Sequence, residues 1–436
     1  MTTGTEHTGR LTAAQGTAMY VGAVLGTGVI SLPALAAEAA GPASLLAWLA
    51  LVLLSAPLAG AFAALGARHP DGGGVSTYAR LAFGDRAAAV VGWCFYFAVP
   101  PGAAAAALFG GGYVAAAFGE ATPTGTAVAA AVLMAAVTAA NAVGLRLTGR
   151  LQLGLAVLLV VLILGAVLLS LPHARTANLE PFAPHGLAAV GSAATLLVWA
   201  FAGWEAITHL AGDFRRPERD LPRATAAAVV LVGLIYLSVA FAVTAVLGPA
   251  AAESDAPLGE LMATGLGGSA RVLAAGAAAL LTFGAMNAYY AGAANLGAAL
   301  CRDGALPGRL TRGRSLAVVS TLAFLALGGT VLAGVGPAPL VLLSTGCFVT
   351  VYAIGVAAAV RLLPRRSAGR RAAFGALVAV LALLALSGRY LLWPLALSGA
   401  ALLYLRWSRS VQERRYRPGA SPNSRLNALA KANSEE

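Results

Sequence analysis

The sequence predicts an all-α polytopic membrane protein, and three observations support this fold class. Of the 436 residues, 59% are hydrophobic and only 11% are charged, whereas a soluble domain has about 25% charged residues. Apolar runs of about twenty residues recur along the whole chain, and each is long enough to cross roughly 30 Å of hydrocarbon. The sequence does not show the short alternating segments that are typical of a membrane β-barrel.

Twelve membrane spans account for the apolar runs. Their expected ranges are 12–39, 43–67, 87–118, 123–143, 147–171, 187–212, 223–247, 269–301, 315–335, 338–360, 372–387 and 390–407. Residues 1–11 form a polar N-terminal tail without the basic-then-apolar pattern of a cleaved signal peptide, so the first span is expected to be retained. The polar segment 411–436 is expected to be a disordered tail.

The basic residues indicate how the spans are oriented. If both termini are cytoplasmic, all but three of the 29 Lys and Arg residues fall on the cytoplasmic side, and the exceptions are Arg175, Arg271 and Arg389. An excess of basic residues in cytoplasmic loops is the general rule for membrane proteins. This topology explains the formal net charge of +12 without a nucleic-acid partner.

Two of the expected spans contain residues that disfavour a continuous helix. Residues 22–33 read GAVLGTGVISLP, and residues 200–205 read AFAGWE; glycine costs about 1 kcal/mol relative to alanine inside a helix. Irregular backbone at membrane depth is tolerated only where it faces protein or a water-filled cavity. Two interrupted helices at matching positions in two halves indicate a transporter binding site. The alternative for the first stretch is close helix packing at Gly22 and Gly26.

Four stretches resemble the amino acid–polyamine–organocation superfamily of transporters. They are GTG with a later proline at 26–28 and 33, WAFAGWE then DFRRPERDLPRA at 199–205 and 213–224, CRDGALP at 301–307, and HPDGGGVSTYARLAFG at 69–84. Within the superfamily, THLAGDFRRPERDLPRA most resembles the bacterial exporters of methionine and branched-chain amino acids. The resemblance implies the LeuT-type fold, with inverted repeats at 12–171 and 187–361 and two peripheral spans at 372–407. It also implies a bacterial plasma membrane.

The resemblance places the substrate between the interrupted first and sixth spans. The backbone amides near Gly26, Thr27 and Gly28 are expected to hold a substrate carboxylate. This is physically reasonable because the N-terminus of a half-helix offers free N–H groups and the positive end of the helix dipole.

Carbonyl groups near Trp199, Ala200 and Phe201 are expected to bind the substrate ammonium group. The Trp199 ring either covers the substrate or packs as an ordinary core aromatic. The remaining expected lining is apolar or mildly polar, and consists of Ala98, Met286, Asn287, Tyr290, Thr345 and Cys347.

Glu205 and His209 lie one helical turn apart in the sixth span. A charge at membrane depth costs several kcal/mol, so such residues normally face a cavity or a partner. Burial favours the protonated form of a carboxyl group, so Glu205 is expected to carry proton coupling, with His209 as a relay. The alternative is structural: Glu205 satisfies backbone groups that the interruption frees, and His209 pairs with it.

Two departures from the superfamily pattern bear on the coupling ion. Sodium-coupled relatives place Ser or Thr hydroxyls on the eighth span, where this chain reads AGAAN at 291–295. Some proton-coupled relatives place a lysine midway along the fifth span, where this chain reads LGLAVLLVVLILG at 153–165. Sodium is therefore disfavoured and lysine-based coupling is excluded. No cofactor is expected.

The expected function is secondary active transport of small neutral, apolar amino acids by alternating access, as an exporter or a proton-linked antiporter or permease. The alternative is an exchanger of cationic amino acids or polyamines, although a cationic substrate favours a second carboxylate in the pocket. A membrane enzyme or sensor is a third class. The sequence shows no metal-ligand cluster, nucleophile–base pair or phosphate loop for it, and Cys94, Cys301 and Cys347 lack metal-ligand spacing. Substrate identity, direction and oligomeric state are not determined by the sequence.

Overall fold

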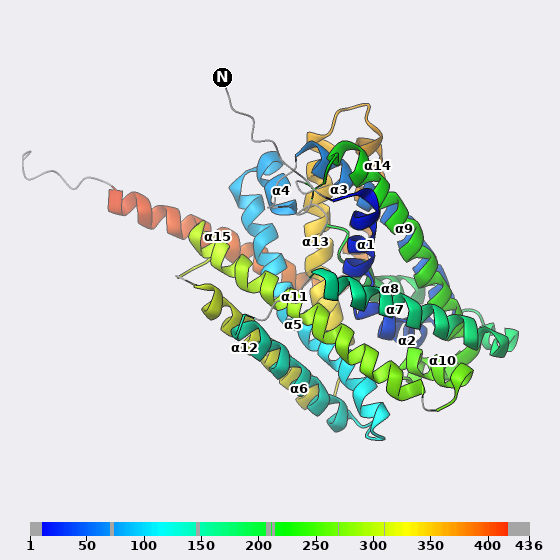
Figure 1. Ribbon diagram of the computed structural model, residues 1–436. Helices are drawn as coiled ribbons and strands as arrows, with labels where there is room; N and C mark the ends of the chain where they lie inside the picture. Colours follow the sequence, from blue (N-terminus) through cyan, green and yellow to red (C-terminus); the bar gives the residue numbers. More distant parts are fainter. Residues whose placement is uncertain are drawn as a thin grey trace, which may run out of the picture.

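The computed structural model describes residues 11–69, 74–144, 149–205, 211, 214–268, 270–308 and 310–416. In chain order its helices are α1 (Ala13–Val24), α2 (Gly28–Ala40), η1 (Gly41–Ala43), α3 (Ser44–Arg68), α4 (Val75–Phe83), α5 (Asp85–Ala117), α6 (Pro123–Ala142), α7 (Gly149–Ser170), η2 (Leu171–His173), η3 (Thr176–Leu179), α8 (Ala189–Leu197), η4 (Val198–Phe201), α9 (Pro217–Ala242), η6 (Val243–Leu247), η7 (Gly248–Glu253), α10 (Pro257–Leu266), α11 (Ala270–Arg302), α12 (Arg312–Leu332), α13 (Ala338–Leu362), α14 (Ala368–Leu386), η8 (Gly388–Leu391) and α15 (Leu392–Tyr416). Figure 1 shows their arrangement.

Helix occupies each of the twelve expected ranges. Within the described residues, eight apolar helical stretches are long enough to cross a membrane, and the first of them, Gly28–Arg68, holds both α2 and α3. Two shorter apolar helices, Val157–His173 and Ala189–Phe201, fall in the fifth and sixth expected ranges. The chain is therefore an all-helical, multi-pass membrane protein.

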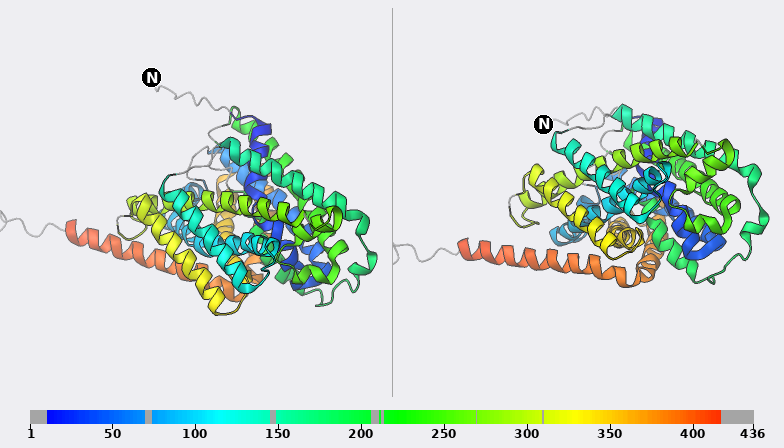
Figure 2. Two further views of the ribbon diagram at one scale, coloured as in Figure 1. Left: turned by 60° about the horizontal axis from the view of Figure 1, so that its bottom comes forward. Right: turned by 90° about the horizontal axis from the view of Figure 1, so that it is seen from below.

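Helix α15 continues past Val411, where the sequence predicts that the polar tail begins. It ends at Tyr416 and extends away from the rest of the bundle (Figure 2). The sequence VQERRY explains the extension, because Gln, Glu and Arg are good helix formers and the first proline comes only at position 418.

The first expected span is broken between α1 and α2. A capping box of Thr12 and Gln15 starts α1, and this arrangement satisfies two orphan amides at a helix N-terminus. The backbone of Leu25 then leaves the helical region with φ −75° and ψ 64°. Helix α2 begins at Gly28, with Thr27 as its N-cap and no side-chain cap hydrogen bond.

The sixth expected span is broken after η4. Helix α8 tightens into the 3₁₀ turn η4, and Ala202 is then extended, with φ −68° and ψ 137°. Gly203 follows with φ 121°, a backbone conformation that side chains with a Cβ atom rarely adopt. This glycine therefore continues the turn out of the helix, two residues before Glu205.

Two groups of helices enclose the breaks. Helix α5 contacts α6, α11, α12 and α13, while α9 contacts α1 and α3, and α2 contacts α8. The element η4 also contacts α13, and α2 contacts α5. Both breaks therefore lie at the boundary between the two groups.

Candidate functional site

The two breaks touch each other at Gly28 and Ala200. A Cβ atom added at Gly28 would lie 3.1 Å from the Cα of Ala200 and 3.1 Å from Cδ1 of Trp199. The φ angle of Gly28 is not in the left-handed region, so its backbone conformation does not require a glycine. The requirement comes from the close approach of Ala200 and Trp199. A Cβ atom added at Gly26, in contrast, would meet nothing within 4 Å. The space beside the first break is therefore on the Gly26 side.

The backbone amides of the first break are only partly available. The amide of Gly26 donates to the carbonyl of Val24 at 2.8 Å, so the expectation that it holds a substrate carboxylate is not supported by this geometry. Thr27 is 4% exposed, and the first amides of α2 have no acceptor four residues back inside the helix. The candidate carboxylate site thus narrows to the N-terminus of α2 at Thr27 and Gly28.

The hydroxyl group of Tyr236 bridges the two breaks. It lies 2.8 Å from the carbonyl oxygen of Val24 and 2.6 Å from that of Ala200, and Tyr236 is fully buried in α9. Because a tyrosine hydroxyl carries one proton, it donates to one of these carbonyls at a time. The Ala200 carbonyl, expected to bind a substrate ammonium group, therefore shares this donor with the Val24 carbonyl.

The side chain of Trp199 is wedged between α5 and α13. A Cβ atom added at Gly102 of α5 would lie 2.8 Å from its ring, and its ring centroid is 6.4 Å from that of Phe348 in a T-shaped contact. The carbonyl of Trp199 accepts from the amide of Ala202 at 3.2 Å. Trp199 thus packs at the site, as both interpretations of this residue require.

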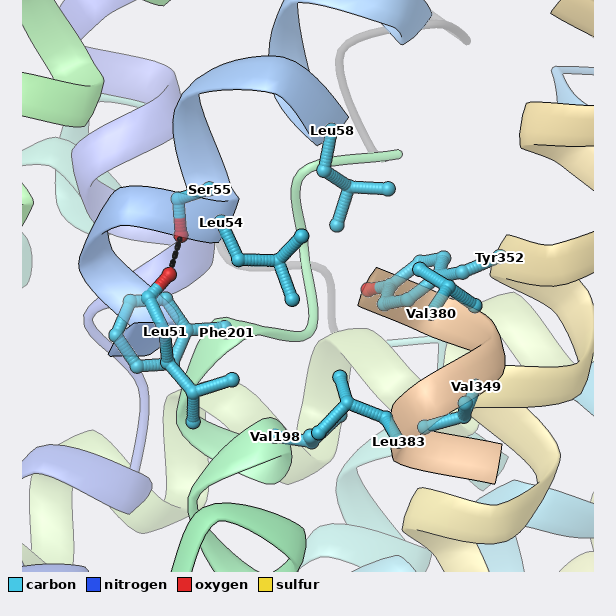
Figure 3. Close-up of a pocket in the computed structure, with 10 residues that line it drawn as sticks. All are labelled: Leu51, Leu54, Ser55, Leu58, Val198, Phe201, Val349, Tyr352, Val380 and Leu383. Atoms are coloured by element: carbon cyan, nitrogen blue, oxygen red, sulfur yellow. Dashed lines mark hydrogen bonds between the residues drawn. The ribbon is translucent and has the colours of Figure 1, made fainter. Parts of the chain in front are cut away.

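The side chain of Phe201 turns to the other side of η4. Its ring centroid lies 5.0 Å from that of Tyr236 and 6.1 Å from that of Trp48. With Val198 it faces Val349 and Tyr352 across an apolar cavity of about 20 Å³ between α3, η4, α13 and α14 (Figure 3). A cavity of this size has room for about one water molecule, so it cannot be the site of an amino acid.

Glu205 links the second break to α13. Its Oε2 atom accepts from the amide of Gly203 at 3.0 Å and from the hydroxyl of Tyr352 at 2.6 Å. The side chain is 8% exposed, and hydrogen bonds to an ionised carboxylate are about twice as strong as neutral ones. Glu205 therefore satisfies one backbone amide at the break, that of Gly203, as its structural interpretation requires. Its contact with Tyr352 also connects the break to α13.

A further tyrosine packs beside the second break. Tyr20 of α1 is buried, and its ring lies 5.5 Å from that of Trp204, which precedes Glu205 in the chain. Tyr289 of α11 is 39% exposed. The predicted partner His209 lies outside the described residues.

The lining residues predicted on α11 are buried. Asn287 accepts at Oδ1 from the side-chain amide of Asn141 in α6 at 2.7 Å, because a pair of amides in apolar surroundings satisfies itself where two helices meet. Tyr290 is fully buried, and its hydroxyl has no hydrogen-bond partner within the described residues. Met286 is fully buried in α11, with no polar contact to define a role.

The lining expected from α5 and α13 is fully buried. Ala98, Thr345 and Cys347 are each 0–1% exposed, and the carbonyl of Ala98 accepts from the hydroxyl of Ser344 at 2.9 Å. Within the described residues, no three His, Cys, Asp or Glu side chains gather as a metal site would require.

Sequence reasoning missed two tyrosines that organise the site, which are Tyr236 and Tyr352. Each is the only tyrosine of its helix, α9 for Tyr236 and α13 for Tyr352. A buried tyrosine usually finds a partner for its hydroxyl, and this was the available signal. The sequence could not show that the partners are the two breaks and Glu205.

Comparisons with known proteins agree with this architecture. The model of the amino acid permease family matches residues 11–430. The chain is 33% identical over 404 residues to the uncharacterized amino acid permease YecA of Bacillus subtilis (strain 168), covering 91% of this chain and 95% of the relative. It is 36% identical over 229 residues to the L-methionine/branched-chain amino acid exporter YjeH of Escherichia coli (strain K12), covering 51% of this chain and 53% of the relative.

A third relative is the branched-chain amino acid permease BcaP of Bacillus subtilis (strain 168), which is 26% identical over 315 residues, 68% of each chain. These proteins are named as permeases and exporters, and none is named as an enzyme. The chain with the broken first helix, the turn at Gly203 and the buried Glu205 therefore belongs to the amino acid permease family, within the amino acid–polyamine–organocation superfamily of transporters.

Proposed function

We propose that this protein is a secondary active transporter of small neutral, apolar amino acids, and that it couples transport to protons through Glu205. Alternating access would use twelve crossings, with inverted repeats at 12–171 and 187–361, and both termini in the cytoplasm of a bacterium. The observation that carries the proposal is the buried Glu205 carboxylate at the second break, held by Gly203 and Tyr352. Membership of the amino acid permease family supports an amino acid as the substrate.

Protonation of Glu205 would change how the second break is held. The ionised carboxylate attracts both the Tyr352 hydroxyl and the Gly203 amide, whereas a neutral carboxyl group is a weaker acceptor. Loading a proton would therefore loosen the contact between the break and α13. A ligand can shift a conformational equilibrium only through such a difference between two states, and this contact provides one.

The surroundings of the breaks favour a neutral substrate with an apolar side chain. The described residues near the site offer one carboxylate, Glu205, and it is already hydrogen-bonded. Trp199 and Phe348 supply apolar surface. The names of two relatives, which refer to methionine and branched-chain amino acids, support the same class.

The substrate class is tested with purified protein in proteoliposomes. Counterflow is measured with leucine, methionine, arginine and putrescine as separate substrates. Leucine and methionine should exchange, while arginine and putrescine should not. Exchange of arginine or putrescine without leucine would overturn the assignment in favour of the cationic alternative.

Proton coupling is tested with Glu205→Gln. Glutamine keeps one oxygen that can accept from Tyr352 and Gly203, but it cannot titrate. The variant should retain leucine exchange and lose accumulation driven by a pH gradient, because only net coupled transport needs the proton to load and leave. Glu38→Gln, at an exposed position in α2, is the matched control and should keep both activities. Full pH-driven accumulation by Glu205→Gln would refute proton coupling at this residue.

A further inference from the structure

Tyr113 joins three elements of the fold. Its side chain lies in α5 and is 2% exposed. The hydroxyl donates to the carbonyl of Ile30 in α2 at 2.6 Å and accepts from the amide of Leu258 in α10 at 3.0 Å. A single oxygen atom therefore connects α5, α2 and α10.

Helix α10 depends on this oxygen for its N-terminal cap. The N-cap residue is Ala256, which has no side-chain acceptor, and Pro257 and Leu258 follow as the first two helical residues. First-turn amides have no partner inside a helix and are normally capped by a polar side chain at the N-cap. Here the Tyr113 hydroxyl takes that role for Leu258.

Small residues bring α10 close enough for this contact. A Cβ atom added at Gly112 would lie 3.3 Å from the backbone oxygen of Asp255, and one added at Gly259 would lie 3.6 Å from Cε1 of Tyr113. The helix α2 packs against both η7 and α10. The Tyr113 hydroxyl is thus buried in the contact that covers this half of the first broken helix.

We propose that the Tyr113 hydroxyl is a latch that holds α2 in the closed position against α5 and α10. The proposal rests on the proposed function, since alternating access requires α2 to separate from this cover in one state. Capping of α10 can persist during that movement, because Tyr113 and Leu258 need not separate. The hydrogen bond from Tyr113 to Ile30 must break when α2 separates from α5 and α10. This bond is therefore the one that opposes the separation.

The latch is tested by the accessibility of a cysteine at position 31. Ser31 lies in α2, is 4% exposed, and its hydroxyl has no hydrogen-bond partner in the described part of the chain, so Ser31→Cys removes no such bond. In a background without Cys94, Cys301 and Cys347, the purified protein in detergent is labelled with a maleimide. Tyr113→Phe should increase the labelling rate by about fivefold to thirtyfold, the range expected for loss of one buried hydrogen bond.

Two further variants separate the latch from simpler effects. Tyr96→Phe removes another buried hydroxyl from α5, which lies 3.1 Å from Ser315 Oγ, and it should leave labelling unchanged. In the double variant Tyr113→Phe with Ala256→Ser, the serine restores a cap for α10 but not the bond to Ile30. Labelling should stay fast in this double variant.

Three outcomes would overturn the latch. They are unchanged labelling in Tyr113→Phe, equally increased labelling in Tyr96→Phe, and recovery of slow labelling on adding Ala256→Ser, which would assign Tyr113 to capping alone. The assay needs no substrate. Absence of leucine flux in wild-type proteoliposomes would refute the proposed function separately, without altering the labelling result.

Discussion

Tyr236→Phe tests whether a protein hydroxyl takes the place of the substrate ammonium group. The substitution removes one oxygen atom, which bridges the carbonyls of Val24 and Ala200 at 2.8 and 2.6 Å. The ring packing against Trp48 and Phe201, at centroid distances of 5.1 and 5.0 Å, is available to phenylalanine as well. The perturbation is therefore confined to the bridge between the two breaks.

The magnitude follows from one lost donor. A buried acceptor without a partner costs about 1–3 kcal/mol, and the two carbonyls share a single proton, so we expect about 1–2 kcal/mol, or roughly fivefold to thirtyfold in an equilibrium constant. This cost falls on the substrate-free carrier, because a bound ammonium group would supply the missing donor. The variant should therefore bind substrate more tightly.

The assay is leucine transport in proteoliposomes, measured both as exchange and as net flux. The KM for exchange should fall by about fivefold to thirtyfold. Net flux should slow relative to exchange because the substrate-free carrier must cross with the Ala200 carbonyl unsatisfied, whereas the Val24 carbonyl keeps the Gly26 amide as a donor. The contacts seen for the Tyr96 hydroxyl are with Ser315 of α12. Tyr96→Phe should therefore change neither the KM for exchange nor the ratio of net flux to exchange. A KM that rises, or a net flux that falls no more than exchange, would show that Tyr236 does not stand in for the ammonium group.

Two further outcomes are expected. Gly28→Val should abolish transport while the protein still reaches the membrane, because even a Cβ atom would lie 3.1 Å from Ala200 and Trp199. The control is Gly375→Val, where an added Cβ atom meets nothing within 4 Å. Leucine transport by a well-expressed Gly28→Val variant would contradict the reasoning. Leucine flux should also be indifferent to sodium, since AGAAN at 291–295 offers no hydroxyl; a steep rise of the initial rate with sodium at fixed pH and ionic strength would refute this.

The sequence alone determined the class of protein and the positions of the breaks. Both depend on local properties. Hydrophobic runs of sufficient length form helices in a membrane because the backbone must satisfy its own hydrogen bonds there, and glycines weaken a helix wherever they occur. The break at Leu25–Thr27 and the turn at Gly203 therefore lie where the residues predict them, and the single carboxylate beside the second break was identifiable as Glu205.

Tertiary structure decided which side chains meet. A membrane helix that is apolar all round carries no polar face to indicate its direction, so the sequence could not tell that Asn287 of α11 turns toward Asn141 of α6. Nor could it show that the phenols of Tyr236 and Tyr352 reach the breaks from α9 and α13. Their hydroxyls take these partners because buried polar groups must be satisfied, and only the packing of distant helices determines which groups are within reach.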